Sequence, residues 1–489
     1  MPAPGSTMGV LADLVDGELS GSGQVRVADV SHDSREVRDG WLFVAVPGAR
    51  FDGHDFLAAA IGNGAAGLCV SRTVSIPIPP GDMPVITVPD TRPVMPLLAA
   101  EVQGHPSRRT EVVGVTGTNG KTTIAFMIEA VAAAASQKCG LIGTIITRLG
   151  DRVIPNPRTT PEATSFQRLL RTMVDDGAEM IACEVSSHAL ALDRVGATRF
   201  AVGAFTNLSM DHLDFHQGME GYFEAKALLL AMAERRVVWV DDPYGAILAA
   251  RYPDALKVGW DAEVGASSIE SDARGSRFRL RIGVASIDAA IHLAGRFNIA
   301  NALVAAACCH LSGLSPEEIA AGLDRLASVP GRFEVVSGDH PVTVVVDYAH
   351  TPEGVKTVID TSRSLTRGRV IAVLGAGGDR DRGKRPHMGI AASAADLLVL
   401  TSDNPRSEDP QLIIEQVLAG VDNPAVITVP DRREAIRGAL AAASPGDIVL
   451  ILGKGHESGQ EIDGVIVPFD DRQVAIDELA NLEIAGSQE

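Results

Sequence analysis

The sequence predicts an α/β protein of three domains: a small N-terminal α/β domain (residues 1–105), a central domain with a mostly parallel sheet (106–330) and a Rossmann-like C-terminal domain (331–489). Three observations support this fold class. The chain has 489 residues, more than one hydrophobic core usually serves. Strand-like and helix-like segments alternate along its central and C-terminal parts, which is typical of parallel sheets covered by helices. A glycine-rich turn joins a strand to a helix at residues 114–123.

The individual elements follow from hydrophobic periodicity and from Gly and Pro breaks. In the first domain we expect short strands at 42–46, 67–70 and 85–88, with a loop at 75–84. The central domain is predicted to contain strands at 111–115, 140–146, 180–185, 200–206 and 237–240 and helices at 121–135, 162–176 and 222–233. In the last domain, strands are predicted at 342–347, 370–374, 397–401, 425–429 and 448–452.

Composition and charge exclude several classes of function. The formal charge of −19 argues against nucleic acid or an anionic membrane as the main partner, because both need a basic surface. The five cysteines show no CxxC spacing and are expected to be buried thiols, without disulfides or zinc, in a reducing compartment. No secretory signal or 18-residue apolar run is present, so we expect a cytoplasmic protein without membrane insertion.

The stretch GVTGTNGKTT at 114–123 has the composition of a phosphate-binding turn. Glycines let successive backbone N–H groups point at one anion, the helix start adds partial positive charge, and Lys121 adds a mobile full charge. Thr122 places a hydroxyl where a phosphate-bound Mg²⁺ needs a hard oxygen ligand. The strict pattern GxxxxGK[ST] asks for glycine where this chain has Val115. The alternative is a plain glycine-rich turn with a surface lysine.

Two polar clusters follow predicted strands of the same sheet. Glu184, in CEVSSHALALDR, should lie at the carboxyl end of its strand, where open α/β sheets bind ligands and a carboxylate suits Mg²⁺. The stretch NLSMDHLDFH offers Asp211, His212, Asp214 and His216. Taken alone, His212 is better interpreted as an ordinary loop histidine than as a metal ligand.

Two further clusters come later in the chain. GRFNIANALVAAACCH brings Asn298 and Asn301 to the start of a very apolar helix, where asparagine is also a common N-cap, and without more context the cap is the favoured interpretation. VDYAHTPEG puts Asp347 and His350 just past a strand end of the third domain. That position suits a ribose or phosphate contact across an interdomain cleft.

Together these motifs resemble the Mur ligases, the ATP-dependent amide-bond-forming enzymes of peptidoglycan precursor synthesis. The resemblance rests on TGTNGKTT, EVSSHAL, NLSMDHLDFH, YFEAKALL, GRFNIANALVA, VPGRFE and DYAHTPE, in this order. Folylpolyglutamate synthases share the central and C-terminal folds but lack the element HDSREVRDGWLFVAVPG and the motif DNPR. GGDRDRGKRP, DNPRSEDP and GKGHE are most similar to family members that join meso-2,6-diaminopimelate to UDP-N-acetylmuramoyl-L-alanyl-D-glutamate.

The resemblance implies a mechanism through an acyl phosphate. The γ-carboxylate of the D-glutamyl residue attacks the γ-phosphorus of ATP, and the amine of the amino acid then displaces phosphate. Lys121 and two Mg²⁺ ions supply the local positive charge that two meeting anions need. One Mg²⁺ is implied near Thr122 and Glu184, and the other near His212 and Lys226. An ammonium group has no lone pair for a metal, so Lys226 is implied to carry a CO₂-derived carbamate, although the sequence alone indicates a solvated helix lysine.

The resemblance also implies the remaining binding residues. ATP is expected to contact Gly117, Thr118, Asn119, Gly120, Lys121, Thr122, Thr123, Asn298, Asn301, Arg332, Asp347 and His350, with the asparagines near the adenine and with Lys384 approaching from the last domain. The UDP substrate is expected to contact Ser34, Arg35, Thr159, Thr160, Ser186 and Arg194. Diaminopimelate is expected to contact Arg380, Asp403, Asn404, Arg406, Gly453 and Glu457.

The DNPR motif carries the expected amino-acid preference. Diaminopimelate differs from lysine by one carboxylate, which Arg406 is expected to bind bidentately while Asp403 and Asn404 receive the neighbouring ammonium group. Lysine would then leave Arg406 buried and unpaired. The alternative is that DNPR is only a polar turn after a strand.

Alternative functions, the oligomeric state and domain motion can also be considered from the sequence. A nucleotide-gated switch would use the phosphate turn without chemistry, a regulatory relative would keep the fold without catalysis, and a lysine-adding ligase is the alternative within the enzyme class. We expect a monomer whose C-terminal domain closes over the nucleotide, with hinges near Pro330 and Gly331.

Overall fold

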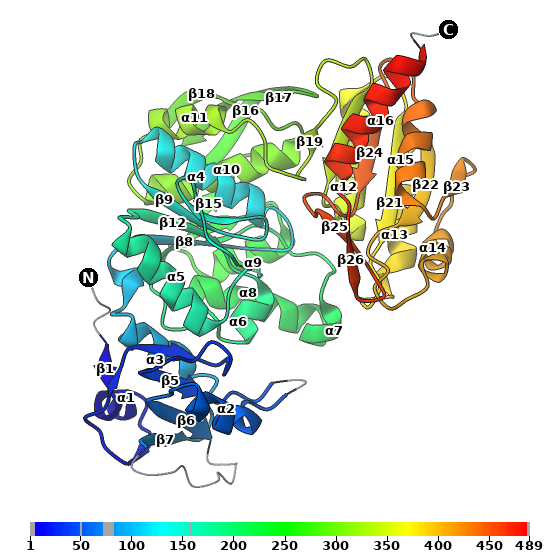
Figure 1. The fold of residues 1–489 in the computed structure, drawn as a ribbon. Helices are drawn as coiled ribbons and strands as arrows, with labels where there is room; N and C mark the ends of the chain where they lie inside the picture. Colours follow the sequence, from blue (N-terminus) through cyan, green and yellow to red (C-terminus); the bar gives the residue numbers. More distant parts are fainter. Residues whose placement is uncertain (1–4, 49–50, 72–82, 157, 487–489) are drawn as a thin grey trace.

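The computed structural model describes residues 5–48, 51–71, 83–156 and 158–486, and it contains three main sheets (Figure 1). In this view the N-terminal domain lies below the central domain, and the C-terminal domain lies beside the central domain. The fold therefore has the three-part α/β architecture that the sequence predicts. The predicted loop at 75–84 lies mostly outside the described residues.

The N-terminal sheet has the strand order β2-β7-β6-β5-β4, in which only β2 is antiparallel to its neighbour. Its strands are β2 (Glu18–Ser20), β4 (Asp29–Ser31), β5 (Trp41–Val44), β6 (Gly67–Ser71) and β7 (Val85–Val88), and a small ribbon pairs β1 (Ser6–Thr7) with β3 (Arg26–Val27). The helices are α1 (Met8–Leu14), α2 (Leu57–Gly62) and α3 (Met95–Val102). Buried side chains of α1 and α3 pack with the sheet into one core.

The central sheet has the order β11-β10-β9-β12-β8-β13-β14-β15-β16-β17-β18. Strands β9 to β16 pair in parallel through β12, β8, β13, β14 and β15, and antiparallel hairpins extend both edges. Their bounds are β8 (Glu111–Thr116), β9 (Cys139–Ile142), β10 (Thr147–Leu149), β11 (Arg152–Val153), β12 (Met180–Glu184), β13 (Phe200–Phe205), β14 (Ala233–Trp239), β15 (Leu256–Val258), β16 (Val264–Asp272), β17 (Gly275–Ile282) and β18 (Ala285–Ile291).

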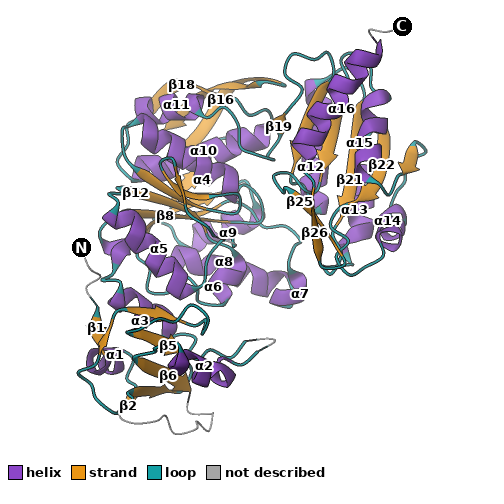
Figure 2. Ribbon diagram, viewed as in Figure 1, coloured by secondary structure: helices purple, strands orange, loops and turns teal. Residues whose placement is uncertain are grey.

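Helices cover both faces of the central sheet (Figure 2). One core contains side chains of α4 (Lys121–Ala134), α10 (Arg296–Leu311) and α11 (Pro316–Arg325). The other contains side chains of α5 (Ala163–Asp175), α8 (Met219–Met232) and α9 (Pro243–Arg251), with the short helices α6 (Ser187–Ala191) and α7 (Leu213–His216) nearby. This double cover buries both faces of β8, β12 and β13, which explains why these strands read as continuous apolar runs.

The C-terminal sheet has the order β19-β20-β24-β21-β22-β23, and only β19 is antiparallel. Its strands are β19 (Glu334–Val335), β20 (Thr343–Asp347), β21 (Val370–Ala376), β22 (Leu397–Ser402), β23 (Val426–Thr428) and β24 (Ile448–Leu452). Helices α12 (Pro352–Leu365), α13 (Lys384–Ala392) and α14 (Pro410–Leu418) share one core, and α15 (Arg432–Ala441) and α16 (Asp471–Gly486) share the other. A hairpin of β25 (Gly459–Ile462) and β26 (Val465–Pro468) follows β24.

The predicted strands are present within a few residues, with two differences. The strand expected at 140–146 ends at Ile142, and the chain then turns back into the antiparallel strand β10. The antiparallel hairpins β16 to β18 were not predicted. Strands β17 and β18 alternate more buried with more exposed residues, and β16 is mostly exposed after its first two residues, so this half-solvated edge gives a weaker signal than a fully buried strand.

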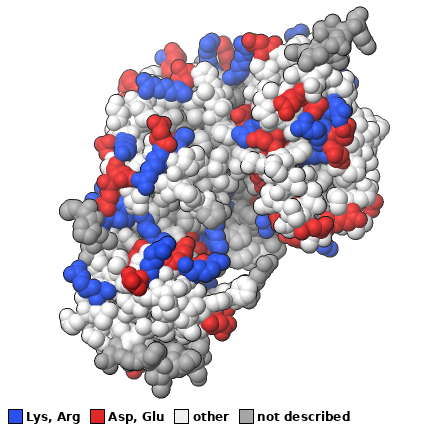
Figure 3. Space-filling view, in the orientation of Figure 1, with Lys and Arg blue, Asp and Glu red and all other residues white. Residues whose placement is uncertain are grey.

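The distribution of surface charge and the state of the cysteines agree with what the composition predicts. On the face shown in Figure 3, acidic and basic side chains are interspersed, and no continuous basic stripe crosses it. All five cysteines are free and buried. Within the described residues, no helix combines the length and the apolar character needed to cross a membrane.

Candidate active site

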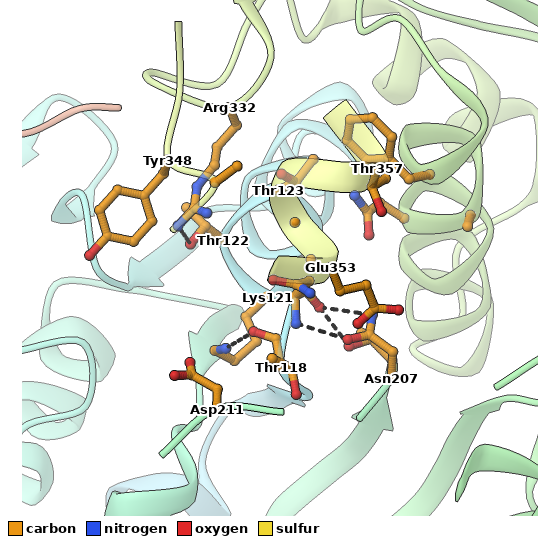
Figure 4. A pocket seen from close by; sticks show the side chains of 18 of the residues that line it. Thr118, Lys121, Thr122, Thr123, Asn207, Asp211, Arg332, Tyr348, Glu353 and Thr357 are labelled. Atoms are coloured by element: carbon orange, nitrogen blue, oxygen red, sulfur yellow. Dashed lines mark hydrogen bonds between the residues drawn. The ribbon is translucent and has the colours of Figure 1, made fainter. Parts of the chain in front are cut away.

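A cavity of about 570 Å³ lies between the central and C-terminal domains (Figure 4). Its central-domain wall comes from the turn after β8, the ends of β12 and β13, and helices α8 and α10. Its other wall comes from Arg332 and residues 347–358 of the C-terminal domain. In Figure 4 the Arg332 side chain reaches the hydroxyl of Thr122 across this boundary. The cavity thus contains polar groups from both domains.

The turn before α4 is built to receive an anion. Gly120 has a φ of +91° and caps the helix without a side-chain acceptor, so the first N–H groups of α4 remain available. A Cβ at Gly120 would lie 2.4 Å from Oδ1 of Asn301. The Lys121 ammonium folds back and donates to the carbonyls of Gly117 and Thr118, at 2.9 Å each. Burial lowers the pKa of Lys121, an effect that the nearby carboxylate of Glu184 opposes.

Glu184 and Thr122 form a buried pair of hard oxygen groups at the edge of the cavity. Glu184 ends strand β12 as predicted, and its Oε2 accepts a hydrogen bond from the Thr122 hydroxyl at 2.9 Å. The backbone N–H and the hydroxyl of Thr144 donate to the same carboxylate, at 2.7 and 3.1 Å. Arg332 donates to Thr122 from the C-terminal domain at 3.0 Å. This donor set fits a divalent cation of the Mg²⁺ type, which prefers carboxylate and hydroxyl oxygens.

Lys226 differs from the expectation based on sequence alone. The side chain is buried, with 1% relative exposure, and is not solvated, because it lies on the packed face of α8, opposite the exposed stripe that contains Glu224 and Leu228. Its Nζ donates to the Gly117 carbonyl at 2.6 Å and lies 4.5 Å from the Tyr222 ring centre. Burial lowers its pKa well below the usual value, and Lys121 adds to this shift while Asp211 opposes it. Burial therefore favours the neutral form of the amine, which is the form that is nucleophilic towards CO₂.

His212 and Asp211 lie on the loop before α7 and line the same cavity. The Nε2 atom of His212 is 3.3 Å from Oδ2 of Asp211, and desolvation lowers the pKa of His212 to about 4. Lys384, at the start of α13, brings its Nζ to 3.9 Å from Oδ1 of Asp211. A residue of the C-terminal domain therefore approaches this wall, as the resemblance implied for Lys384. Among the described residues, no group of three or more His, Cys, Asp or Glu side chains is arranged to hold a metal ion.

The capping interpretation of the two asparagines on α10 is wrong. The helix begins at Arg296 and its N-cap is Gly295, so both asparagines lie inside the helix. Asn298 donates to the carbonyl of Ala294 at 2.9 Å, and Asn301 donates to Oδ1 of Asn298 at 3.2 Å. Asn301 lines the cavity, and Asn298 lies behind it and fixes its amide.

Asp347 and His350 also line the cavity, just beyond β20. Asp347 accepts hydrogen bonds from the backbone N–H groups of Phe333 and Ala349 at 2.6 and 2.7 Å, so its carboxylate joins the segment before β19 to the loop after β20. Burial raises the pKa of Asp347 and lowers that of His350. The Nδ1 atom of His350 is 2.8 Å from the carbonyl of Tyr348.

The residues expected to hold the UDP substrate are not gathered in one place. Thr159 and Ser186 line the cavity. The Thr160 hydroxyl donates to the Glu184 carbonyl at 2.8 Å and accepts the Ser186 N–H at 3.1 Å, so it connects this region to the end of β12. The remaining members lie outside the cavity lining: Arg194 is paired with Glu162 at 2.9 Å, Ser34 is buried, and the exposed Arg35 is paired with Asp33 at 2.6 Å.

The residues expected to bind the amino acid form a second cluster at the carboxyl ends of β22 and β24, outside the lining of the first cavity. The Asn404 amide donates to Oε2 of Glu457 at 2.7 Å, and the Asn404 backbone N–H donates to Oδ1 of Asp403 at 2.6 Å. Gly453 has a φ of +114°, and a Cβ there would lie 2.5 Å from Oδ2 of Asp403. Arg380 is exposed.

Arg406 is not left unpaired in the absence of a ligand, contrary to the expectation from DNPR. Its Nη1 donates to the carbonyl of Gly378 at 2.7 Å, and its Nε lies 3.2 Å from the carboxylate of Glu461 on β25. Glu461 lies on the hairpin of β25 and β26, outside the DNPR motif, so the motif alone could not indicate this pairing.

Sequence reasoning missed three residues of these clusters. Thr144 binds the Glu184 carboxylate but stands 40 residues away in a segment without a motif. Tyr348 lies within DYAHTPE, and the Arg332 guanidinium carbon stacks over its ring, 4.7 Å from the ring centre. Lys454, in GKGHE, is fully buried. The position of Lys454 between two glycines, directly after a buried strand, could have indicated its burial.

Comparison with known proteins agrees with this three-part architecture. Residues 26–112 match the Mur ligase family, catalytic domain; residues 115–309 match the Mur ligase middle domain; and residues 331–455 match the Mur ligase, glutamate ligase domain. These matches cover well over half of the chain. The chain belongs to the Mur ligase family.

Particular relatives narrow the comparison. The chain is 44% identical over 454 residues to the UDP-N-acetylmuramoyl-L-alanyl-D-glutamate–2,6-diaminopimelate ligase of Aquifex aeolicus, covering 92% of this chain and 93% of the relative. It is 45% identical over 487 residues to the protein of the same name from Streptomyces coelicolor, covering 95% of each. A solved structure of such a ligase has a TM-score of 0.70 at 30% identity, covering 98% of this chain and 99% of the other. MurF from Acinetobacter baumannii, at 18% identity, a TM-score of 0.68 and coverage of 92% and 96%, shares the fold.

Proposed function

We propose that this protein is an ATP-dependent ligase that joins meso-2,6-diaminopimelate to UDP-N-acetylmuramoyl-L-alanyl-D-glutamate, a cytoplasmic step of peptidoglycan precursor synthesis. The observation that carries the proposal is the cavity between the domains. It combines an uncapped helix start with Lys121, the buried Thr122–Glu184 pair and the buried Lys226, whose pKa is lowered, and its second wall comes from the C-terminal domain. Relatives at 44% and 45% identity carry the name of this activity.

The first step places two anions next to each other. An oxygen of the D-glutamyl γ-carboxylate forms a bond to the γ-phosphorus of ATP, the bond from that phosphorus to its bridging oxygen breaks, and ADP leaves. We assign the neutralisation of the transferring phosphoryl group to Lys121 and the N–H groups at the start of α4, and their position at the turn after β8 supports this assignment. The Arg332 guanidinium adds a positive charge from the C-terminal domain.

The second step forms the amide. The neutral amine of diaminopimelate attacks the acyl carbon, the bond from that carbon to the phosphate oxygen breaks, and phosphate leaves with one oxygen of the original carboxylate. The nitrogen loses a proton as the amide forms. The acyl phosphate must be protected from water, and closure of the C-terminal domain over the cavity provides this protection.

Thr122 and Glu184 would hold one Mg²⁺, and His212 together with a carbamate on Lys226 would hold the other. When bound, these ions supply positive charge to the phosphate oxygens. The carbamate forms when the neutral Nζ of Lys226 adds to the carbon of CO₂ and loses a proton. The burial of Lys226 and its lowered pKa support this assignment, because only the unprotonated amine has the lone pair that the reaction needs.

The amino-acid cluster gives a refined assignment for diaminopimelate. The side-chain oxygen Oδ1 of Asn404 already accepts hydrogen bonds from Lys454 and from the Glu461 backbone N–H. The Asn404 side chain therefore offers a ligand a donor and not an acceptor. We therefore assign Asn404 with Arg406 to a carboxylate and leave the ammonium group to Asp403. The expectation that Asn404 receives the ammonium group is not compatible with this hydrogen-bond pattern.

Release of phosphate tests the proposal. The protein is mixed with ATP and Mg²⁺, and with the UDP-muramoyl dipeptide and diaminopimelate both together and singly. A ligase releases phosphate only when both are present, and a nucleotide switch releases it without either. Replacing diaminopimelate with lysine in the same assay separates the two kinds of ligase, and faster release with lysine would overturn the assigned amino acid.

A further inference from the structure

Lys454 is a fully buried charged side chain beside the amino-acid cluster. It directly follows Gly453 after strand β24 and has a relative exposure of 0%. Its Nζ donates to the carbonyl of Gly459 at 2.6 Å, to Oε2 of Glu457 at 3.2 Å and to Oδ1 of Asn404 at 3.3 Å. These three contacts use the three N–H donors of an ammonium group. A buried cation with this set of partners is arranged to hold them in place.

The same contacts determine which way the Asn404 amide faces. Lys454 Nζ and the backbone N–H of Glu461 both donate to one end of the amide, at 3.3 and 2.9 Å, and both are donors only. That end must therefore be the oxygen. The other end lies 2.7 Å from the Glu457 carboxylate, which is an acceptor, so it must be the nitrogen. Among the contacts of the described residues, Nδ2 makes this one hydrogen bond and has a second N–H to offer.

Lys454 also fixes the Glu457 carboxylate. Oε2 of Glu457 accepts from both Lys454 and Asn404, which places an acidic side chain against the amide without free rotation. Glu457 keeps 32% side-chain exposure, so its other oxygen is accessible from the solvent side. The three side chains form a closed triangle in which each member contacts the other two.

We propose that Lys454 is a positioning residue for the amino-acid substrate, a role that rests on the proposed function. It does not touch the substrate. It holds the Asn404 amide with its N–H outward and the Glu457 carboxylate at a fixed position, so the cluster presents a donor to a substrate carboxylate. Without Lys454, the Asn404 amide oxygen keeps only the Glu461 backbone N–H as a donor and the Glu457 carboxylate loses one of its two donors, so the amide is held less firmly and presents its N–H to a carboxylate less well. Affinity for a substrate with two carboxylates should then fall more than affinity for lysine.

The direct test is Lys454→Met, which keeps length and apolar volume and removes the donors. The expected result is a rise of about 10- to 100-fold in KM for diaminopimelate, the scale of a lost buried charge-assisted hydrogen bond. The KM values for ATP and for the UDP-muramoyl dipeptide should stay within about twofold, since Lys454 lies outside the first cavity. The preference for diaminopimelate over lysine should narrow. Lys356→Met, on the exposed side of α12, is the matched control and should change none of these values.

A second variant pair keeps the proposal testable if Lys454→Met does not fold. Asn404→Asp places two carboxylates against each other at Glu457, and adding Glu457→Gln restores a donor–acceptor pair between the two positions. The double variant should regain the thermal stability that Asn404→Asp loses, yet keep the raised KM for diaminopimelate, because the outward donor is still missing.

The outcomes separate this inference from the proposed function. Unchanged KM and unchanged preference in a folded Lys454→Met enzyme would overturn the positioning role while leaving the ligase intact. Full recovery of diaminopimelate affinity in the double variant would overturn it as well. If the unmodified protein shows no phosphate release that depends on diaminopimelate, the proposed function itself fails.

Discussion

Lys226 is the residue whose burial and chemistry bear most strongly on the mechanism. This buried amine lies beside the predicted phosphate-binding turn, where its Nζ donates to the Gly117 carbonyl and lies over the Tyr222 ring, and burial lowers its pKa. The sequence alone could not predict this, because lysine on a helix is most often solvated and burial is decided by the sheet against which α8 packs. The family motif supplied the functional assignment, and the structure supplies the physical basis for it.

Replacing Lys226 should therefore remove catalysis. We expect Lys226→Ala to lower kcat by about 10²- to 10³-fold, the scale of one lost preorganised electrostatic group, while Lys226→Glu keeps more activity because it restores an anionic oxygen. Lys257→Ala on strand β15 is the control and should be neutral. Steady-state kinetics with and without bicarbonate provide the measurement. Activity of Lys226→Ala within a few-fold of the unmodified enzyme would contradict the carbamate assignment.

Arg406 is the residue on which we expect substrate choice to depend. Because Glu461 already pairs with it, a substrate lacking the distal carboxylate loses an interaction without leaving the guanidinium bare. We expect Arg406→Ala to raise KM for diaminopimelate by about 10- to 100-fold and to narrow the preference over lysine, with the KM for ATP nearly unchanged. Arg433→Ala on α15 is the control. Competition between the two amino acids measures the effect, and an unaltered preference would refute the assignment.

At the scale of elements, strand ends and helix starts bring the site together. The carboxyl ends of β8, β12 and β13 carry the phosphate turn, Glu184 and the loop to His212, and these strands were predictable because both faces are buried. Contacts made by short connections were not predictable. Thr144 follows the early end of β9, and Glu461 lies on a hairpin that no periodic pattern marked.

One ion pair between elements gives a pH-dependent stability. Arg385 on α13 is buried and donates to both oxygens of Glu408, at 2.8 and 3.0 Å, next to Gln416 on α14. Hydrogen bonds from Arg385 lower the pKa of Glu408 from 4.5 to about 2. A carboxyl with a lowered folded-state pKa contributes stability that is complete above 4.5 and is lost as pH falls towards 2.

Glu408→Gln should accordingly lower the melting temperature at pH 7, and the difference from the unmodified protein should shrink as the pH falls from 4.5 to about 2. Thermal unfolding followed by circular dichroism across this range measures it. Glu415→Gln, on helix α14 just after Glu408, is the control and should change the melting temperature little at any pH. A difference that does not vary with pH would contradict the ion-pair explanation.

At the scale of the whole molecule, the site exists only where two domains meet. Contacts of Arg332 with Thr122 at 3.0 Å and of Lys384 with Asp211 at 3.9 Å join the central and C-terminal domains around the cavity. Gly331 has a φ of +64°, and a Cβ there would lie 2.1 Å from the backbone nitrogen of His456, so this residue is packed against the C-terminal domain. Bending at the proposed hinge is therefore expected at Pro330 and the residues before it.

Closure of the C-terminal domain is the corresponding prediction. Binding of a non-hydrolysable ATP analogue together with the UDP-muramoyl dipeptide should reduce the radius of gyration, because ligands on both walls draw the domains together. Small-angle scattering of free and ligand-bound protein measures this, with the analogue alone as a comparison. Identical scattering curves in all states would count against closure.

The transfer of oxygen from substrate to phosphate tests the central claim most directly. The UDP-muramoyl dipeptide is prepared with ¹⁸O in the D-glutamyl γ-carboxylate, and the phosphate released with ATP and diaminopimelate is analysed by mass spectrometry. A reaction through an acyl phosphate leaves one ¹⁸O atom in each phosphate and one in the new amide carbonyl. Unlabelled phosphate released alongside the amide product would contradict the acyl-phosphate mechanism.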